Sequence, residues 1–360
     1  MKSYYPKFPS WSTHTQDIWK YVLHAITARS FDFQIKTKDI ISFFGSFSTG
    51  IKWEGTVLAP NGFLYGIPRS TNTILKIDPS DDSYSEFGNI PGSAKWNGGV
   101  LARNGCIYGC PRRSSTVLKI NTVDDTLSTF GSLSTLDFKW YGGVLAKNDC
   151  IYFAPTDHES ILKINTRDDS ITLIGNFSGT YKWRGAVLSP DGNIYFIPAN
   201  ATSVLKINPT DDSVELLGNL SGGNNKWWGG FLAPNGCIYG IPGNSTAILK
   251  IDPVNDLVQL FGNVPDAPTG SRAFGVITPG GIIYGMANSA TSILRLDTTN
   301  DTWKTLGDFS TTNRNYRGAA LAPNGALYAI PTDAPEILKI QVIEGNVPIN
   351  YCLSPFFNKP

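Results

Sequence analysis

The chain has 360 residues, and 16% of them are charged, below the roughly 25% that is usual in soluble domains. Thirty basic and 29 acidic side chains leave a formal net charge of +1, which argues against nucleic-acid binding driven by bulk charge. Glycine (36 residues), proline (23 residues) and aromatic side chains (12%) are plentiful. This composition is typical of short strands joined by tight turns rather than of a helical protein.

No apolar run approaches the roughly 20 residues that a membrane-spanning helix needs, so we expect no membrane span. The first residues, MKSYYPKFPSWSTHTQDIW, lack the continuous apolar stretch of a secretory signal, which favours a soluble intracellular protein. Five cysteines occur without a CxxC motif or a Cys/His cluster. This pattern argues against a zinc centre and a disulfide framework, and we expect no cofactor.

The N-terminal segment predicts a short amphipathic helix, because Ile18 and Val22 lie four residues apart on one helical face. We assign residues 1–37 to an N-terminal arm that contains this helix, and the apolar residues 344–360 to a C-terminal tail. Both segments either pack on the rest of the protein or insert into a partner. In the second case Ile18, Trp19 and Val22 are candidate binding residues.

A motif that begins with Lys-Trp in five of its copies occurs seven times after this arm. It first reads KWEGTVLAPNGFLYGIP from Lys52 and returns as KWNGGVLARNGCIYGCP from Lys95. Successive copies start about 44 residues apart, which is typical of the blades of a β-propeller. The tryptophan position of the seven copies is expected at Trp53, Trp96, Trp140, Trp183, Trp227, Ala273 and Tyr316.

Each copy predicts four strands. The first resembles GGVLA and is followed by a Pro-Asn-Gly turn; the second resembles CIYGIP, with a tyrosine in every copy. The third resembles ILKID, and a turn of the form P-x-D-D-S leads to a fourth strand that ends in Phe-Gly. Glycine at the start of the first strand is expected where blades crowd around an axis and leave no room for side chains.

The two ends of the repeat predict a closed ring. Residues 39–45 match the fourth strand of later copies, whereas the last copy ends with its third strand at residues 336–340. An early strand that completes the final blade would remove the exposed edge that an open array leaves. We therefore predict an all-β protein, a seven-bladed β-propeller of four-stranded antiparallel blades over residues 38–343.

The order of these motifs over about 300 residues resembles the repeats of streptogramin-lyase-like, NHL and SMP-30-like propellers. The resemblance implies the propeller fold, which hosts lyases, lactonases, lectins and scaffolds alike. The lyases rely on a pair of histidines. Here only His158 lies in the predicted ring, because His14 and His24 precede it.

Two sets of charged residues recur in the blades. The Lys or Arg of the ILKID strand is expected to pair with nearby acids rather than to form a ring that binds an anion. The Asp pairs of the P-x-D-D-S turns are expected to cap those turns, because no calcium-binding loop pattern is present. We therefore predict no metal site.

The Lys-Trp pairs are candidate binding residues on one face of the ring. Tryptophan beside lysine and hydroxyl groups suits sugar stacking or an interface anchor. The alternative is that each indole wedges between adjacent blades, as large aromatic side chains in repeats often do. The pairs are Lys52 and Trp53, Lys95 and Trp96, Lys139 and Trp140, Lys182 and Trp183, and Lys226 and Trp227.

The leading functional hypothesis is a non-enzymatic propeller that binds protein partners, as a scaffold or as a subunit of a larger assembly. No convergent catalytic set is evident in the sequence. A lectin-like propeller with several sugar sites is the first alternative, and exposed indoles would favour it. A propeller lyase or lactonase is the second alternative, and it would need acids or histidines gathered at the axis.

Overall fold

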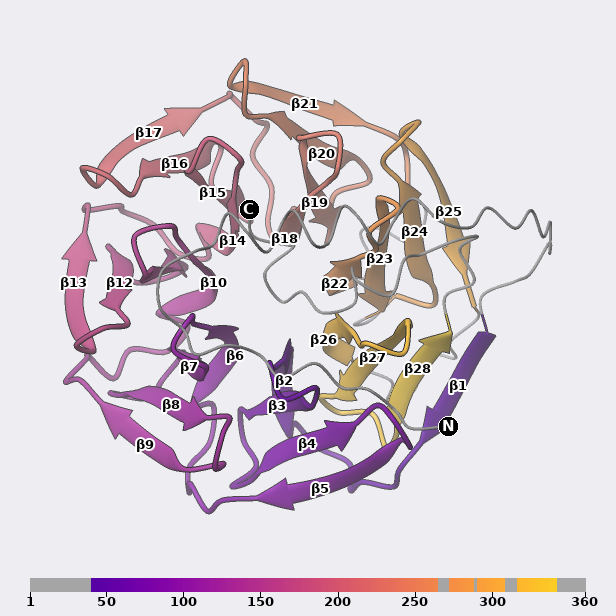
Figure 1. Cartoon of the computed structure of the whole chain (residues 1–360). Coiled ribbons are helices and arrows are strands. Elements are labelled where there is room, and N and C mark those ends of the chain that lie inside the picture. Colours follow the sequence, from indigo (N-terminus) through magenta and orange to yellow (C-terminus); the bar gives the residue numbers. More distant parts are fainter. Residues whose placement is uncertain (1–39, 265–271, 288–289, 308–315, 342–360) are drawn as a thin grey trace, which may run out of the picture. The chain divides into compact units, whose positions relative to one another are not determined.

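A computed structural model of the chain describes residues 40–264, 272–287, 290–307 and 316–341. Its strands form seven four-stranded antiparallel sheets, and Figure 1 shows these sheets around a common axis. The predicted all-β, seven-bladed propeller is therefore confirmed. The helix expected in the N-terminal arm and the C-terminal tail lie outside the described residues. Among the residues that are described, no helix is long and apolar enough to cross a membrane.

The first three blades each take four consecutive strands, from the axis outward. Blade one holds β2 (Trp53–Leu58), β3 (Leu64–Pro68), β4 (Ile74–Asp78) and β5 (Ser83–Phe87). Blade two holds β6 (Trp96–Leu101), β7 (Cys106–Pro111), β8 (Val117–Asn121) and β9 (Leu127–Phe130). Blade three holds β10 (Trp140–Leu145), β11 (Cys150–Pro155), β12 (Ile161–Asn165) and β13 (Ser170–Ile174).

The next three blades follow the same order. Blade four holds β14 (Trp183–Leu188), β15 (Ile194–Pro198), β16 (Val204–Asn208) and β17 (Ser213–Leu217). Blade five holds β18 (Trp227–Leu232), β19 (Ile238–Pro242), β20 (Ile248–Asp252) and β21 (Leu257–Phe261). Blade six holds β22 (Arg272–Ile277), β23 (Ile282–Ala287), β24 (Ile293–Asp297) and β25 (Thr302–Leu306).

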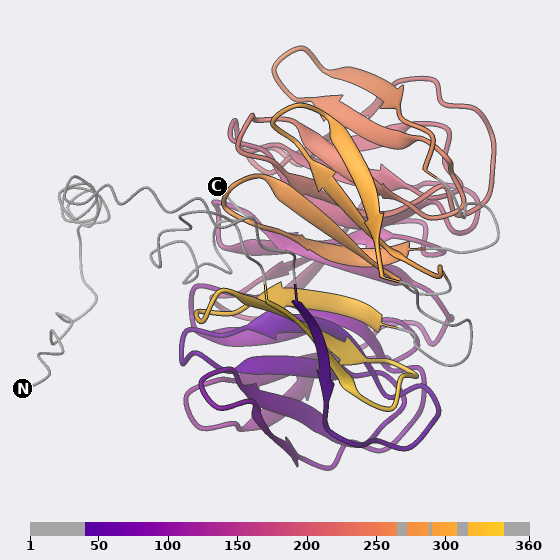
Figure 2. The ribbon, with the colours of Figure 1, turned by 90° about the vertical axis from the view of Figure 1, so that its right-hand side faces the viewer.

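The last blade joins both ends of the ring. It combines β26 (Tyr316–Leu321), β27 (Ala326–Pro331) and β28 (Ile337–Gln341) with β1 (Ile40–Phe44) as its outermost strand. Strands β1 and β28 are antiparallel, and Figure 2 shows the indigo strand β1 beside the yellow strands of this blade. The innermost strand β26 also contacts β2 of blade one. The closure predicted from the offset repeat is thus confirmed.

The hydrophobic core lies between neighbouring blades, because the inner strands of each blade carry apolar side chains on both faces. One such layer combines Tyr65 and Ile74 of blade one with Trp96 and Leu118 of blade two. The third strand shows how the sequence produces this layer. In β4, as in the other third strands, every residue of the Ile-Leu-Lys-Ile run except the lysine is buried.

Crowding at the axis requires glycine at the start of the innermost strands. Gly55 has a φ of +81°, and a Cβ atom there would lie 2.4 Å from the Cα atom of Gly98 in the next blade. A β-bulge coincides with this glycine, because the pairing of β2 with β3 shifts register between Trp53 and Thr56. Bulges redirect side chains. The residue after the tryptophan therefore leaves the regular ladder close to the axis.

In blade six the predicted tryptophan position was wrong by one residue. Arg272, not Ala273, occupies the tryptophan position, because it lies opposite Ala287 in the register that other blades use for tryptophan. The buried Arg272 guanidinium also donates from Nε to the carbonyl of Ser292 at 3.1 Å. The indole of Trp53 donates to the carbonyl 20 residues later in the same way. Without a tryptophan in this copy, the sequence offered no anchor for the alignment.

Candidate functional site

Six of the repeated lysines join neighbouring blades. The Lys76 ammonium lies 2.5 Å from a carboxylate oxygen of Asp125 in the next blade, and the Tyr65 hydroxyl donates to the same carboxylate at 2.7 Å. We call this arrangement an inter-blade triad. The other five are Tyr108, Lys119 and Asp169; Tyr152, Lys163 and Asp212; Tyr195, Lys206 and Asp256; Tyr239, Lys250 and Asp301; and Tyr328, Lys339 and Asp82. The prediction that these lysines pair with turn acids is confirmed.

Both residues of an Asp pair have a structural role. Asp81 accepts a hydrogen bond from the backbone N–H of Ser83 at 2.9 Å, so it caps the turn as predicted. Asp82, in the left-handed region at a φ of 63°, belongs to an inter-blade triad. In the described part of the chain, no group of three or more His, Cys, Asp or Glu side chains is placed to hold a metal ion.

The candidate lysines of the Lys-Trp pairs bind backbone carbonyls. The Lys95 ammonium donates to the carbonyls of Thr71 at 2.6 Å and Gly92 at 2.8 Å, which belong to two loops on one face of the ring. Burial lowers the pKa of Lys95, and that of Lys139, to about 8. The ammonium groups of Lys52, Lys139, Lys182 and Lys226 donate to pairs of backbone carbonyls in the same way.

The five candidate tryptophans are buried between blades. Trp140, for example, packs with Val100 and Tyr108 of the preceding blade, and its indole N–H donates to the carbonyl of Ser160. The exposed fraction is 4% or less for Trp53, Trp96, Trp140, Trp183 and Trp227. Buried indoles offer no face to a sugar ring. The structure therefore favours the interpretation of these residues as wedges, and it disfavours the lectin-like alternative.

The free energy of unfolding should fall steeply between pH 10 and 12. Burial raises the pKa of Tyr108 and Tyr152 to about 12, whereas an unfolded tyrosine ionises near pH 10. Above that pH the unfolded chain has lost protons that the folded chain keeps, so stability is lost as the pH rises. The lowered pKa of Lys95 makes stability rise with pH, because the unfolded chain keeps a proton that the folded chain has lost. This rise ends near pH 10.4, where an unfolded lysine also loses its proton.

Urea unfolding at pH 9, 10 and 11 measures this fall. Tyr108→Phe removes one of the titrating groups, so its stability should decline less between pH 10 and 11 than that of the unmodified chain. Equal stability at pH 10 and pH 11, where the lysine effect is nearly complete, would show that the tyrosines of the inter-blade triads ionise as readily in the folded protein as in the unfolded chain.

The residue after the tryptophan differs from blade to blade, although its neighbours repeat. We define the axial cluster by two sets of residues. The first set holds four residues that directly follow a tryptophan, together with the residue at the corresponding position of β26. The second set holds two arginines, one from the loop after β3 and one from the loop after β7. The members of the axial cluster are Glu54, Arg69, Arg112, Tyr141, Arg184, Trp228 and Arg317. Figure 1 shows the seven first strands around the axis. Ion pairs, a hydrogen bond and cation–π contacts link the side chains of Glu54, Arg69, Tyr141, Arg184, Trp228 and Arg317 to one another across these strands.

Glu54 is the buried acid of the axial cluster. The Arg69 guanidinium lies 2.8 Å from its Oε2 atom, and the Tyr141 hydroxyl donates to Oε1. Arg317 approaches the same carboxylate at 3.8 Å. Burial and the negative charge of Glu54 together raise the pKa of Tyr141 well above its usual value. One carboxylate therefore contacts three different blades.

Arg184 is held by aromatic rings. Its side chain is buried, and its guanidinium carbon lies 4.1 Å from the ring centroid of Trp228, 5.0 Å from that of Tyr181 and 5.1 Å from that of Tyr141. Its Nε and Nη1 atoms are buried without a hydrogen-bond partner. Burial lowers the pKa of this guanidinium. Cation–π attraction thus stabilises a cation whose hydrogen-bonding capacity is partly unused.

The axial cluster has an excess of positive charge. Its four arginines outnumber its one carboxylate, that of Glu54, which contacts Arg69 and Arg317. Arg112 pairs instead with the half-exposed Asp137 at 3.1 Å. Buried charges of one sign attract ligands of the other sign, because a low-dielectric environment screens them weakly. The arrangement is therefore suited to binding an anionic group.

The histidine of the predicted ring lies in a structural contact. The His158 imidazole stacks on the indole of Trp140, with ring centroids 4.4 Å apart, and its Nδ1 accepts a hydrogen bond from the backbone of Ser160. Burial lowers its pKa. These contacts occupy His158 in the packing of blade three, so they give no support to the lyase alternative.

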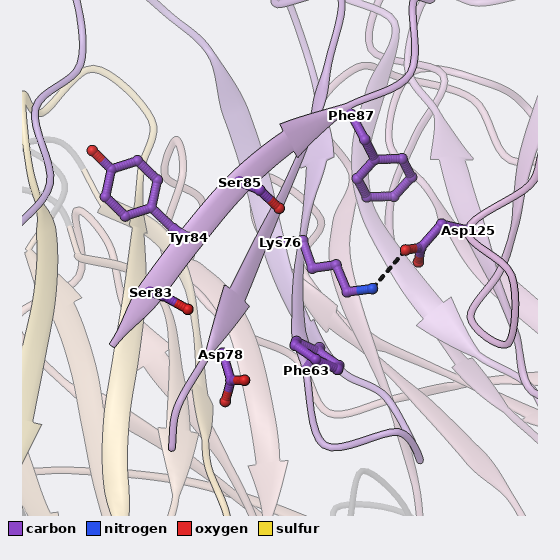
Figure 3. A pocket seen from close by; sticks show the side chains of 8 residues that line it. All are labelled: Phe63, Lys76, Asp78, Ser83, Tyr84, Ser85, Phe87 and Asp125. Carbon is purple, nitrogen blue, oxygen red and sulfur yellow. Dashed lines mark hydrogen bonds and ion pairs between the residues drawn. The ribbon is translucent and has the colours of Figure 1, made fainter. Parts of the chain in front are cut away.

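A pocket with a volume of about 330 Å³ lies near the outer side of blades one and two. Figure 3 shows that Lys76, which already belongs to an inter-blade triad, points past Phe63 toward Asp125. The charged pair of this pocket, Lys76 and Asp125, therefore serves to join blades one and two. Its lining residues are Phe63, Lys76, Asp78, Ser83, Tyr84, Ser85, Phe87 and Asp125.

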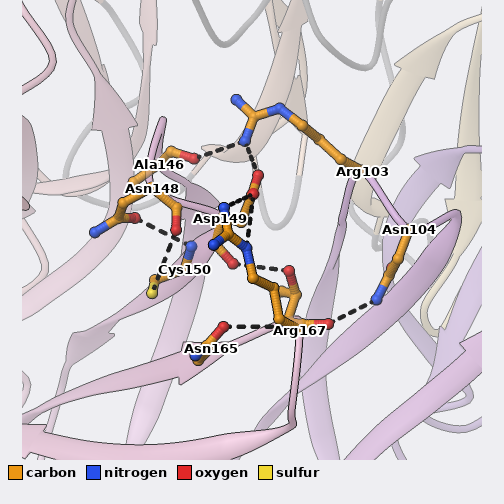
Figure 4. A network of polar contacts seen from close by, with 9 residues as sticks. Arg103, Asn104, Ala146, Asn148, Asp149, Cys150, Asn165 and Arg167 are labelled. Atoms are coloured by element: carbon orange, nitrogen blue, oxygen red, sulfur yellow. Dashed lines mark hydrogen bonds and ion pairs between the residues drawn. The ribbon is translucent and has the colours of Figure 1, made fainter. Parts of the chain in front are cut away.

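A polar network links blades two and three at the turns of their first hairpins. Asp149 replaces the turn glycine at a φ of 62°, and its carboxylate pairs with Arg103 and, at 2.7 Å, with Arg167 (Figure 4). The Arg167 side chain is 72% exposed. Exposed pairs of this kind contribute only about 0–1 kcal/mol to stability. Arg103 and Arg167 are therefore suitable control positions for the buried arginines of the propeller.

The fold defines this chain as a seven-bladed β-propeller, and solved structures share that fold. Virginiamycin B lyase from Staphylococcus aureus, solved as a catalytically inactive His-to-Ala variant with quinupristin, has a TM-score of 0.73 and 16% identity. The match covers 85% of this chain and 100% of the lyase. A streptogramin B lyase has a TM-score of 0.70 and 17% identity over 84% of this chain and 97% of its own.

Propellers of another kind are also similar. The WD40 repeats of RRP9 have a TM-score of 0.64 and 9% identity, over 84% of this chain and 97% of theirs. No protein-family model matches the sequence, and no curated protein matches it. The resemblance to streptogramin-lyase-like propellers is thus confirmed for the fold. Because lyases and WD40 repeats share this architecture, fold alone does not choose between catalysis and binding.

Proposed function

We propose that this protein is a non-enzymatic interaction propeller whose axial cluster binds an acidic segment of a protein partner. The observation that carries the proposal is the excess of arginine over carboxylate among the described residues of the axial cluster. The lysines of the inter-blade triads and of the Lys-Trp pairs have partners within the fold. The axial arginines, unlike these lysines, do not repeat from blade to blade. A site for one particular partner requires such residues, because repeated residues would form several equivalent sites.

The N-terminal residues Ile18, Trp19 and Val22 are a second proposed contact, because the amphipathic helix that the sequence predicts there would suit docking to an apolar groove of a partner. A partner that occupies the axis and also contacts the arm would make this chain a subunit of a larger assembly. The Lys-Trp pairs contribute to this function indirectly, by holding the loops on one face of the ring.

Binding of a fluorescent octaglutamate peptide to the full chain tests the proposal, with octaglutamine as the neutral comparison. We expect octaglutamate to bind in about 0.1 M salt and to dissociate in about 1 M salt, where the Debye length falls to about 3 Å. The double variant Arg112→Gln, Arg317→Gln should weaken binding at least about tenfold, since lost charge pairs at interfaces often cost more than the corresponding 1.4 kcal/mol.

The matched control is Arg103→Gln with Arg167→Gln, which removes the same charge from exposed positions away from the axis. This control should bind octaglutamate with nearly unchanged affinity. Circular dichroism verifies that both double variants are folded. Equal losses in the two double variants would mean that net charge alone attracts the peptide, and absence of binding in low salt would contradict the proposal.

A further inference from the structure

We infer that Arg184 is the anchor for one carboxylate group of the partner, a deeper statement of the proposed function on which it rests. The other arginines of the axial cluster each have a carboxylate: Arg69 and Arg317 share Glu54, and Arg112 pairs with Asp137. Arg184 forms no ion pair among the described residues, although it is only 2% exposed.

The unused donors of Arg184 lie on different edges of its guanidinium group. Nε belongs to one forked edge and Nη1 to the other, and both are buried without a hydrogen-bond partner. A planar guanidinium binds a carboxylate through two parallel N–H groups along such an edge. Buried polar groups in proteins are otherwise almost always hydrogen-bonded. The missing partner is therefore an acceptor, and a carboxylate along either edge would accept from one of these two donors and supply the opposite charge.

The surroundings of Arg184 hold it in place without using its donors. Trp228, Tyr141 and Tyr181 attract the cation through their rings, and the Tyr141 hydroxyl is directed to Glu54. The indole Nε1 of Trp228 is a further buried donor without a partner. Two residues in contact thus both have unused donors, which indicates an acceptor outside the described fold.

A single negative charge fits this position better than a dianion does. Glu54 already brings one carboxylate to the hydroxyl of Tyr141, whose ring also contacts Arg184. A phosphate dianion would add two charges beside that carboxylate, whereas a carboxylate adds one. Glutamate or aspartate side chains and a C-terminal carboxylate have the required chemistry, in keeping with an acidic segment of a protein.

Thermal melting of the full chain in sodium acetate, compared with sodium chloride at equal ionic strength, tests the inference. Acetate is the probe for a lone carboxylate, and it should raise the melting temperature by about 2 °C or more once its concentration exceeds its Kd several-fold. Arg184→Gln should lose this increase. Arg184→Lys, which keeps the cation but lacks the forked donors, should lose it as well, and it serves if the glutamine variant does not fold.

The control Arg103→Gln should keep the full acetate effect. An increase that persists in both Arg184 variants, or is absent from the unmodified chain, would overturn the inference. An increase in phosphate but not in acetate would overturn the choice of a carboxylate. Octaglutamate binding separates the two proposals: if it depends on Arg112 and Arg317 but is unchanged in Arg184→Lys, the proposed function stands and the Arg184 anchor does not.

Discussion

Deletion of residues 1–46 should leave an open, aggregation-prone propeller, whereas deletion of residues 1–30 should leave a closed ring. The longer deletion removes β1, whose residue Phe44 lies opposite Ile337 in the last blade and packs edge-to-face on Tyr328. Its loss exposes the backbone groups of β28 together with the buried side chain of Leu338. An apolar strand with a free edge pairs readily with other chains.

Light scattering after size exclusion measures the aggregation, and thermal melting measures the stability of the two truncated chains. A synthetic peptide of residues 38–47, added during refolding, should restore a monodisperse protein to the longer deletion. A scrambled peptide of the same composition should not. Equal melting temperature and equal monodispersity of the two deletions would show that the ring does not depend on β1.

Trp140→Ala should lower the free energy of unfolding by about 3–5 kcal/mol, the usual cost of truncating a fully buried aromatic side chain. The change leaves a cavity between blades two and three and removes the hydrogen bond to Ser160 and the stack with His158. Urea unfolding measures the loss. Trp303→Ala is the matched control on the outer strand β25, where the indole is only partly buried, and it should cost less than half as much.

The Trp140→Ala variant also separates the two interpretations of the Lys-Trp pairs, sugar binding and wedging between blades. A chain that stays as stable as the original but loses signal on a glycan array would show that Trp140 binds sugar. A chain that loses stability without any change on the array would agree with a wedge between blades.

The fold could be predicted because its determinants are local and repeated. The ring closure followed from residues 39–45, which match the fourth strand of later copies, together with the last copy, which ends with its third strand. Blade six was aligned one residue off, because a buried arginine can replace an indole in the same hydrogen bond and no tryptophan marks the position. The partner of Lys76 could only be narrowed to the turn acids, since Asp125 is 49 residues away in the next blade.

The axial cluster was missed for a different reason. Sequence comparison between blades emphasised the residues that repeat, and these have structural roles. The informative signal was the position after each tryptophan, where Glu54, Tyr141, Arg184 and Trp228 stand between repeated neighbours. Its meaning depends on the β-bulge and on the closure of the ring, which bring unlike residues of distant blades together.

The inter-blade triads have a consequence for how such a chain can change in length during evolution. In each triad the tyrosine and lysine come from one blade and the aspartate from the next. A gene duplication of one whole repeat would therefore supply an aspartate for the blade before it and a tyrosine and lysine for the blade after it. Such an insertion leaves no triad incomplete, whereas an insertion of part of a repeat separates partners. Growth by whole units is thus the change in length that preserves every one of these contacts.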